Sequence, residues 1–401
     1  MSQTGKKNLV ITSIALYFTY FIHGIGASIM GQYKPELAAH WGAKALSDGT
    51  MDVSMVVSVI AALGLGRLIS LPFSGPLSDK FGRRLSGIIG VICYAAYFMG
   101  IAFAPSMGVA YAFAIVGGIA NSFLDTCVSP TCMEIYVNNP SVANLFTKFS
   151  MCISQFLLPF LIGFVAAANM SYRTIFIVAG AAIFIDGILI LFLPFPERNT
   201  AGTVKKEKAK LKITPAALAA ILIGFTSSST FMLWLNCNQE LGKLYNLSDP
   251  SKIQSFYAVG TFAAILCSSV FIKKGLKEIN ILIIYPLISF IMLGLCYFIQ
   301  NPTICLIGGF VIGFAGAGGV LAVSTTAEFF PENKGTATSM VMIASSVANY
   351  TILTLAGYIT KTAGTSAPRM ILLLNMAVTF IGILLALFVK MNRGDRVEIS
   401  E

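Results

Sequence analysis

The stretch GPLSDKFGRRL at residues 75–85 separates two apolar segments, each long enough to cross a membrane. About twenty apolar residues span a hydrocarbon core of about 30 Å when they are helical. Within the stretch, Gly75 and Gly82 permit tight backbone turns, and Asp79 can accept hydrogen bonds from the N-terminus of a helix. The sequence therefore predicts two transmembrane helices joined by a short polar loop.

Apolar segments of this length recur along the whole chain. Of its 401 residues, 56% are hydrophobic and 11% are charged, whereas a soluble domain is about 25% charged. We expect an all-α, multi-pass protein of the cell (inner or plasma) membrane, whose first span is retained because no small-residue cleavage site follows it. The twelve predicted spans are residues 9–31, 53–74, 86–104, 107–132, 144–168, 173–195, 214–238, 252–272, 279–299, 302–327, 335–360 and 367–390.

The distribution of Lys and Arg predicts the orientation of these spans. Positive residues concentrate in the segments 80–84, 198–212 and 390–396, which lie on the same side as the N-terminus. Positively charged loops are retained in the cytoplasm, so we predict that both termini are cytoplasmic. The net charge of +10 is spread over these loops, and it does not indicate a nucleic-acid partner.

The chain reads as two related halves. Residues 197–213 are the longest polar stretch between spans, and they divide the spans six and six. We predict two pseudo-symmetric six-helix bundles, at 1–196 and 214–401, joined by this cytoplasmic linker. Such repeats are typical of secondary transporters, whose substrate site lies where the halves meet. The echoing segments are KFGRR (80–84) with KKGLK (273–277), and TCME (131–134) with TTAE (325–328).

The loop at 75–85 resembles the signature loop of the major facilitator superfamily, Gly-x-Leu-x-Asp-(Arg/Lys)-x-Gly-Arg-(Arg/Lys), and it meets every fixed position. The resemblance implies that Asp79 latches onto the eleventh helix and that Arg83 pairs with Glu134. A weaker copy of the loop would pair Lys277 with Glu328. The predicted gating residues are Gly75, Asp79, Gly82, Arg83, Arg84, Glu134, Lys277 and Glu328.

Of the charged residues inside predicted spans, Arg67 in the second and Asp125 in the fourth lie at similar depth. A charge at the centre of a membrane helix costs about 2.5 to 3.5 kcal/mol, so each needs a partner or a wet cavity. Asp125 is the candidate acid for proton transfer or substrate binding, with Arg67 as its partner or as an anion clamp. A closed ion pair that only holds the bundle together is the alternative.

Other polar residues within the spans are candidates for the same cavity. Asn121 and Ser129 share the face of Asp125 because they lie four residues away on either side. His23 is a proton relay or a packing histidine. The further candidates for proton coupling or substrate contact are Tyr20, Gln32, Trp234, Asn238 and Asn349.

The sequence indicates a transporter and no enzyme. It has two histidines, no cysteine cluster and no phosphate-binding loop, so we expect no metal and no cofactor. We expect a monomer that moves a small polar organic solute, such as an organic acid or a sugar, by proton symport. The alternatives are a proton-coupled efflux antiporter for drugs or metabolites, which the absent fifth-helix antiporter motif disfavours, and a channel or a non-transporting receptor.

The predicted orientation can be checked with reporter fusions. Green fluorescent protein fused after Glu401 should fluoresce, and alkaline phosphatase at the same position should be inactive, because that end is predicted to be cytoplasmic. Phosphatase fused after Asn301, in a predicted outer loop, is the matched control and should be active. Active phosphatase at the C-terminus would contradict the prediction.

Overall fold

The computed structural model describes residues 3–45, 51–137, 140–196, 213–316, 321–330 and 334–392, and almost all of them are helical. Helices satisfy every backbone hydrogen bond internally, as a chain in hydrocarbon requires. The helices are α1 (Gln3–Gln32), α2 (Lys34–His40), α3 (Ser54–Phe81), α4 (Arg83–Phe103), α5 (Met107–Ile135), α6 (Pro140–Ala167), α7 (Arg173–Phe192), α8 (Pro215–Leu244), α9 (Lys252–Lys273), α10 (Glu278–Phe298), α11 (Pro302–Gly316), α12 (Leu321–Ala327), α13 (Lys334–Ala363) and α14 (Ala367–Met391).

Eleven described stretches are long and apolar enough to cross a membrane. The last of them, Ala337–Met391, contains both α13 and α14, which a short 3-10 turn at Gly364–Ser366 separates. Counting α13 and α14 separately gives one apolar segment for each predicted span, with residues 317–320 of the tenth span outside the described residues. The predicted all-α membrane fold is confirmed. Many large apolar side chains on these helices are exposed, such as Phe164 and Phe192, as expected of a surface that faces lipid.

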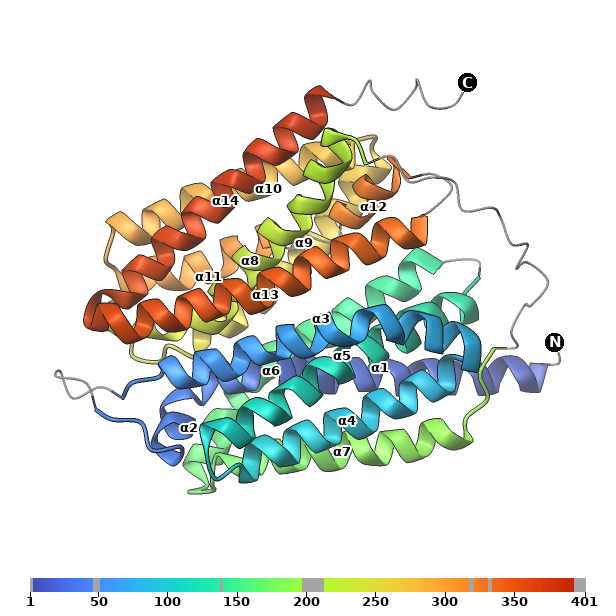
Figure 1. Cartoon of the computed structure of the whole chain (residues 1–401), viewed down its shortest axis with the longest axis horizontal. Coiled ribbons are helices and arrows are strands. Elements are labelled where there is room, and N and C mark those ends of the chain that lie inside the picture. Colours follow the sequence, from blue (N-terminus) through green and yellow to red (C-terminus); the bar gives the residue numbers. More distant parts are fainter. Residues whose placement is uncertain are drawn as a thin grey trace.

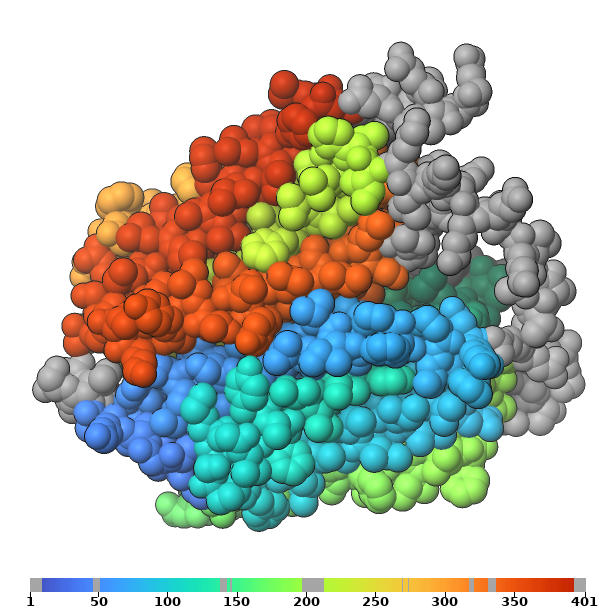
Figure 2. Space-filling view, in the orientation of Figure 1, coloured from blue at the N-terminus to red at the C-terminus, as the bar shows by residue number. Residues whose placement is uncertain are grey.

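The helices form two groups, α1 to α7 and α8 to α14, that lie against each other along α3 and α13 (Figure 1). Figure 2 shows the same seam in space-filling form, with α13 in orange above α3 in blue. The predicted linker at 197–213 lies, apart from Ile213, outside the described residues, so the predicted bundle boundaries stay a prediction. We call the end of the bundle where α1 begins and α14 ends the terminal face, and the opposite end the far face.

The two groups contact each other from the middle of the bundle to the far face. A Cβ atom on Gly64 of α3 would lie 2.6 Å from the backbone nitrogen of Tyr350 on α13. Nearer the far face, a Cβ on Gly357 of α13 would lie 3.1 Å from Ser58 Oγ on α3. Ser255 Oγ of α9 donates a hydrogen bond of 2.9 Å to the carbonyl oxygen of Phe156 on α6. The two groups are therefore in close contact on this side of the molecule.

Glycines also set the packing within each group. A Cβ on Gly66 of α3 would lie 2.0 Å from the carbonyl oxygen of Ile115 on α5, and one on Gly118 would lie 2.1 Å from that of Leu63. The second group repeats this contact between α9 and α11, where a Cβ on Gly260 would lie 2.0 Å from the carbonyl oxygen of Phe310. Small residues let membrane helices approach backbone to backbone, and both groups use them at equivalent helices.

The loop at 75–85 differs from the prediction in one respect. Gly75 lies inside α3, which continues through Pro72 and Pro76 to Phe81, so the turn predicted at Gly75 is wrong. Membrane helices tolerate proline because neighbouring helices and side chains satisfy the backbone groups that it leaves unpaired. Continuing the helix exposes fewer backbone groups than ending it would. Gly82 does form a turn, with φ of 98°, a backbone conformation that favours glycine.

The glycine contact between α3 and α5 leads to a prediction. Gly118→Val should lower the midpoint of thermal unfolding in detergent, because the new side chain must push two backbones apart at a cost of about 1 to 3 kcal/mol or more. Gly163→Val is the matched control, since a Cβ there meets no heavy atom within 4 Å. Equal midpoints for the two variants would contradict the packing described.

Candidate functional site

An ion pair lies near the middle of the first helix group. Arg67 Nη2 of α3 lies 2.6 Å from Asp125 Oδ2 of α5, and the two side chains are 21% and 15% exposed. The phenol of Tyr20 on α1 donates a hydrogen bond of 2.6 Å to the other carboxylate oxygen. The close approach of α3 and α5 at Gly66 and Gly118 allows the arginine to reach the acid. Both oxygens of Asp125 are thus engaged, from two different helices.

Several polar atoms around this pair are buried without a partner in the described part of the chain. They are His23 Nδ1, Arg67 Nε and Asn121 Oδ1. The His23 ring lies 5.4 Å from that of Tyr20 and 5.5 Å from that of Tyr94, between centroids. Buried polar groups in proteins are nearly always hydrogen-bonded, so these atoms mark hydrogen-bonding capacity beside the ion pair that the described contacts leave unused. Ser129, one turn beyond Asp125, is half-buried.

The candidates in the second group are also buried, and the hydrogen bonds among the described residues do not join them to the ion pair. Trp234 Nε1 and both side-chain polar atoms of Asn238, on α8, have no partner among the described residues. Asn349 on α13 instead accepts a hydrogen bond of 2.6 Å from Ser228 Oγ. The remaining candidate, Gln32, ends α1 of the first group at the far face, where it accepts a hydrogen bond of 2.6 Å from Gln239 Nε2.

The signature loop is tied together by its two arginines at the terminal face. Arg83 contacts Asp79 at 2.8 Å and Glu134 at 3.4 Å, and so links α3, α4 and α5. Arg84 donates a hydrogen bond of 2.7 Å to the carbonyl oxygen of Leu193, just after α7. The Asp79 side chain is 68% exposed. Its predicted latch to the eleventh span stays a prediction.

The weaker copy of the loop is arranged differently from the first. Lys277 immediately precedes α10, and Glu328 follows α12. Its pairing with Lys277 stays a prediction. The next residue along, Glu278, accepts a hydrogen bond from Ser324 Oγ of α12, so an acid of α10 already binds the helix that precedes Glu328.

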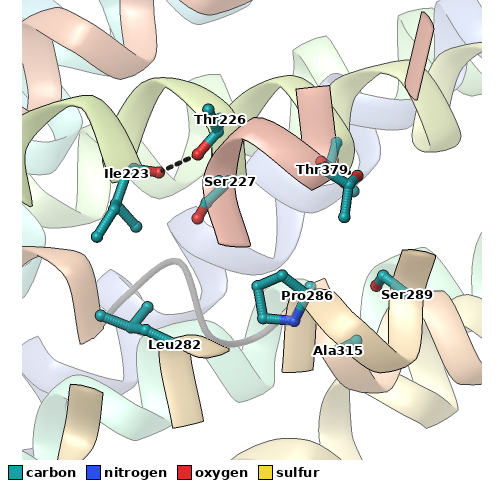
Figure 3. Close-up of a pocket in the computed structure, with 11 residues that line it drawn as sticks. Ile223, Thr226, Ser227, Leu282, Pro286, Ser289, Ala315 and Thr379 are labelled. Carbon is teal, nitrogen blue, oxygen red and sulfur yellow. Dashed lines mark hydrogen bonds between the residues drawn. The ribbon is translucent and has the colours of Figure 1, made fainter. Parts of the chain in front are cut away.

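A small cavity, lined by apolar residues and several hydroxyl groups, lies within the second group between α8, α10, α11 and α14 (Figure 3). Its volume of about 20 Å³ accommodates one water molecule. The Thr226 hydroxyl donates to the carbonyl oxygen of Ile223, and the hydroxyls of Thr230 and Thr379 lie 2.8 Å apart. Pro286 has no N–H, so the carbonyl of Leu282 one turn earlier lacks its usual helical donor, and both residues line this cavity. A buried water would satisfy these groups.

A second buried ion pair, Lys34 with Glu240, was absent from the sequence predictions. A lysine directly after an apolar span reads as a loop charge, and the seventh span was predicted to end at residue 238. In the structure α8 continues to Leu244 and places Glu240 one turn beyond Asn236. One feature of the sequence could have indicated this contact. Gln32 and Gln239 are polar residues at the far ends of the first helix of each half, and Lys34 and Glu240 follow them closely.

Comparison with known proteins gives consistent relatives. The family model described as Major Facilitator Superfamily matches residues 16–325. "Inner membrane transport protein YdiM" of Escherichia coli is 33% identical over 394 residues, covering 95% of this chain and 94% of that protein. "Uncharacterized MFS-type transporter YfkL" of Bacillus subtilis is 30% identical and covers 88% and 90%. "Quinolone resistance protein NorA" of Staphylococcus aureus is 26% identical over about half of each chain.

Solved structures share the fold across nearly the whole chain. The inward open conformation of the xylose transporter XylE from E. coli superposes with a TM-score of 0.75 at 17% identity and covers 95% of both chains. The nucleoside transporter NupG superposes with a TM-score of 0.74 at 12% identity, covering 96% of this chain and 99% of that one. At these identities the likeness concerns the fold alone.

The ion pair can be tested by a double-mutant cycle. Arg67→Met and Asp125→Leu should each lower the thermal midpoint in detergent, because removing one partner of a buried pair leaves an uncompensated charge at a cost of about 3 to 5 kcal/mol. The double variant buries no charge and should unfold at a higher temperature than either single variant. If the midpoint of the double variant falls by the sum of the decreases in the two single variants, the two side chains do not interact, which would contradict a close pair.

Proposed function

Since the chain belongs to the Major Facilitator Superfamily and is a multi-pass membrane transporter, not an enzyme, we propose that it carries a small polar organic solute by proton-coupled alternating access. The single observation that supports this is the cluster of Arg67, Asp125 and Tyr20, with unpartnered polar atoms around it. A purely structural ion pair needs no unpaired polar atoms beside it. A site that receives a solute or a proton does.

The chemistry of the cluster favours an anionic or hydroxylated solute. The guanidinium of Arg67 offers planar donors that match a carboxylate, and its Nε is unpartnered in the described residues. Asn121 Oδ1 and His23 Nδ1 add one acceptor and one group that donates or accepts. When a solute anion competes for Arg67, Asp125 loses its counter-charge and binds a proton more readily. Solute and proton binding are thereby favoured together, which is symport.

We propose further that the described state is closed at the far face. The hydrogen bonds and glycine contacts between the groups at that face support this arrangement. The exposed Asp79 at the terminal face is consistent with an unengaged latch there. With both termini cytoplasmic, as the loop charges predict, the site would then be reached from the cytoplasm.

Proton-coupled efflux is the second candidate function. The observation that favours it is the similarity to a protein named for quinolone resistance, which covers about half of the chain. An antiporter and a symporter can share the Arg67 and Asp125 pair, and they differ in whether solute and proton favour or oppose each other at the site. The direction of solute movement under an imposed pH gradient separates the two.

The transport proposal is tested in proteoliposomes. A thermal-shift screen of organic acids and sugars first identifies a ligand, because a solute that binds the folded state raises its apparent stability. The concentration of that solute inside the vesicles should then rise above the concentration outside when the outside is the more acidic side. Accumulation that ignores an imposed pH gradient would overturn the coupling, and solute expulsion would establish the antiporter.

The role of the acid is tested in the same assay. Asp125→Asn should abolish accumulation driven by the pH gradient, because an amide cannot carry the proton, while solute exchange at equal pH should persist. Asp186→Asn is the matched control, because Asp186 is a buried acid of the same helix group that does not contact Arg67 or Asp125 among the described hydrogen bonds. It accepts a hydrogen bond of 2.6 Å from the Thr19 hydroxyl. Uphill accumulation by Asp125→Asn would contradict the proposed role.

A further inference from the structure

Lys34 is a buried lysine at the boundary between the two helix groups. Its side chain is 1% exposed, and its Nζ lies 2.5 Å from Glu240 Oε2 and 2.5 Å from the carbonyl oxygen of Asn236. Lysine is almost never fully buried unless it is paired, because its ammonium loses its hydration. This pair therefore holds the start of α2 against α8, two elements about two hundred residues apart in sequence.

The contact is reinforced on the α1 side. Gln239 Nε2 donates a hydrogen bond of 2.6 Å to Gln32 Oε1, and both side chains are buried. A Cβ on Gly31 would lie 3.1 Å from Asn236 Oδ1, so α1 and α8 are in close contact here. The ion pair and the amide pair together form a polar clasp between the groups at the far face.

The clasp is built so that it can open. Glu240 Oε1 is buried without a partner among the described residues, so the acid uses only one of its two oxygens. A cavity of about 380 Å³ adjoins the pair, and Lys34, Glu240 and Lys243 all line it. Charges separated next to such a space can be hydrated at once, which lowers the penalty for breaking a buried pair.

We propose that Lys34 and Glu240 are the far-face lock of the transport cycle, closed in the described state and broken when the central site turns to the far side. The proposal rests on the proposed function, because only alternating access requires this contact to break. Loss of the pair then shifts the population toward the state that is open at the far face and closed at the terminal face.

Hydrogen–deuterium exchange of the intact protein tests this shift. In Lys34→Met and Glu240→Gln, exchange should become about tenfold faster in peptides covering 28–40 and 234–245, as expected if the lock contributes a tenfold bias between the states. Exchange should at the same time become slower at the terminal face, in peptides covering 72–81 and 321–330. Lys243→Met is the matched control, since it removes an exposed positive charge from the same cavity, and it should match the parent.

The reciprocal change separates a lock from a merely structural contact. Faster exchange at the far face without slower exchange at the terminal face means local loosening, and it would overturn the proposal, as would no change at all. If Lys34→Met does not yield folded protein, Gln239→Leu removes the neighbouring amide bond and should shift exchange in the same two directions. Solute flux by the parent protein is measured in parallel. If the parent carries solute but the exchange rates of the variants match those of the parent, the lock alone is refuted. If the parent carries no solute, the proposed transport function is refuted.

Discussion

The absence of water from the hydrocarbon core is the constraint on which the rest of this structure depends. Without water, a single segment that crosses the membrane must be helical, because a helix pairs all of its backbone groups within itself. Each buried charge likewise needs a partner, since no water can hydrate it. The chain meets the second requirement with two ion pairs placed differently. Arg67 and Asp125 lie within one helix group, and Lys34 and Glu240 join the two groups at the far face. We propose that the first binds and the second gates.

Backbone contact between helices makes the inner pair possible. Without hydrophobic attraction between helices in lipid, close packing at small residues supplies much of the association. Gly66 and Gly118 bring α3 and α5 together just where Arg67 meets Asp125, and Gly260 repeats the contact in the second group, 194 residues after Gly66. The second group has the packing without the charges.

The sequence predicted the fold and the inner site better than the boundary between the halves. Spans, repeats and the depth of Arg67 and Asp125 follow from hydropathy and helical rise, which are local properties. The turn at Gly75 was predicted wrongly because a glycine permits a turn without requiring one. The pairing of Lys34 with Glu240 was missed, since it depends on how two helix groups meet across the molecule, and no periodicity encodes that contact.

In alternating access, one site is open to one side of the membrane at a time, and the accessibility of a cysteine placed at that site tests this property most directly. In Ser129→Cys, the new thiol lies one turn from Asp125. A membrane-impermeant maleimide, followed by mass spectrometry of the residue-129 peptide, is applied separately to inside-out and right-side-out vesicles. We expect modification from the terminal side only, and transfer of reactivity to the far side when Lys34 is also replaced by Met. Equal modification of Ser129→Cys from both sides would indicate a channel and contradict alternating access.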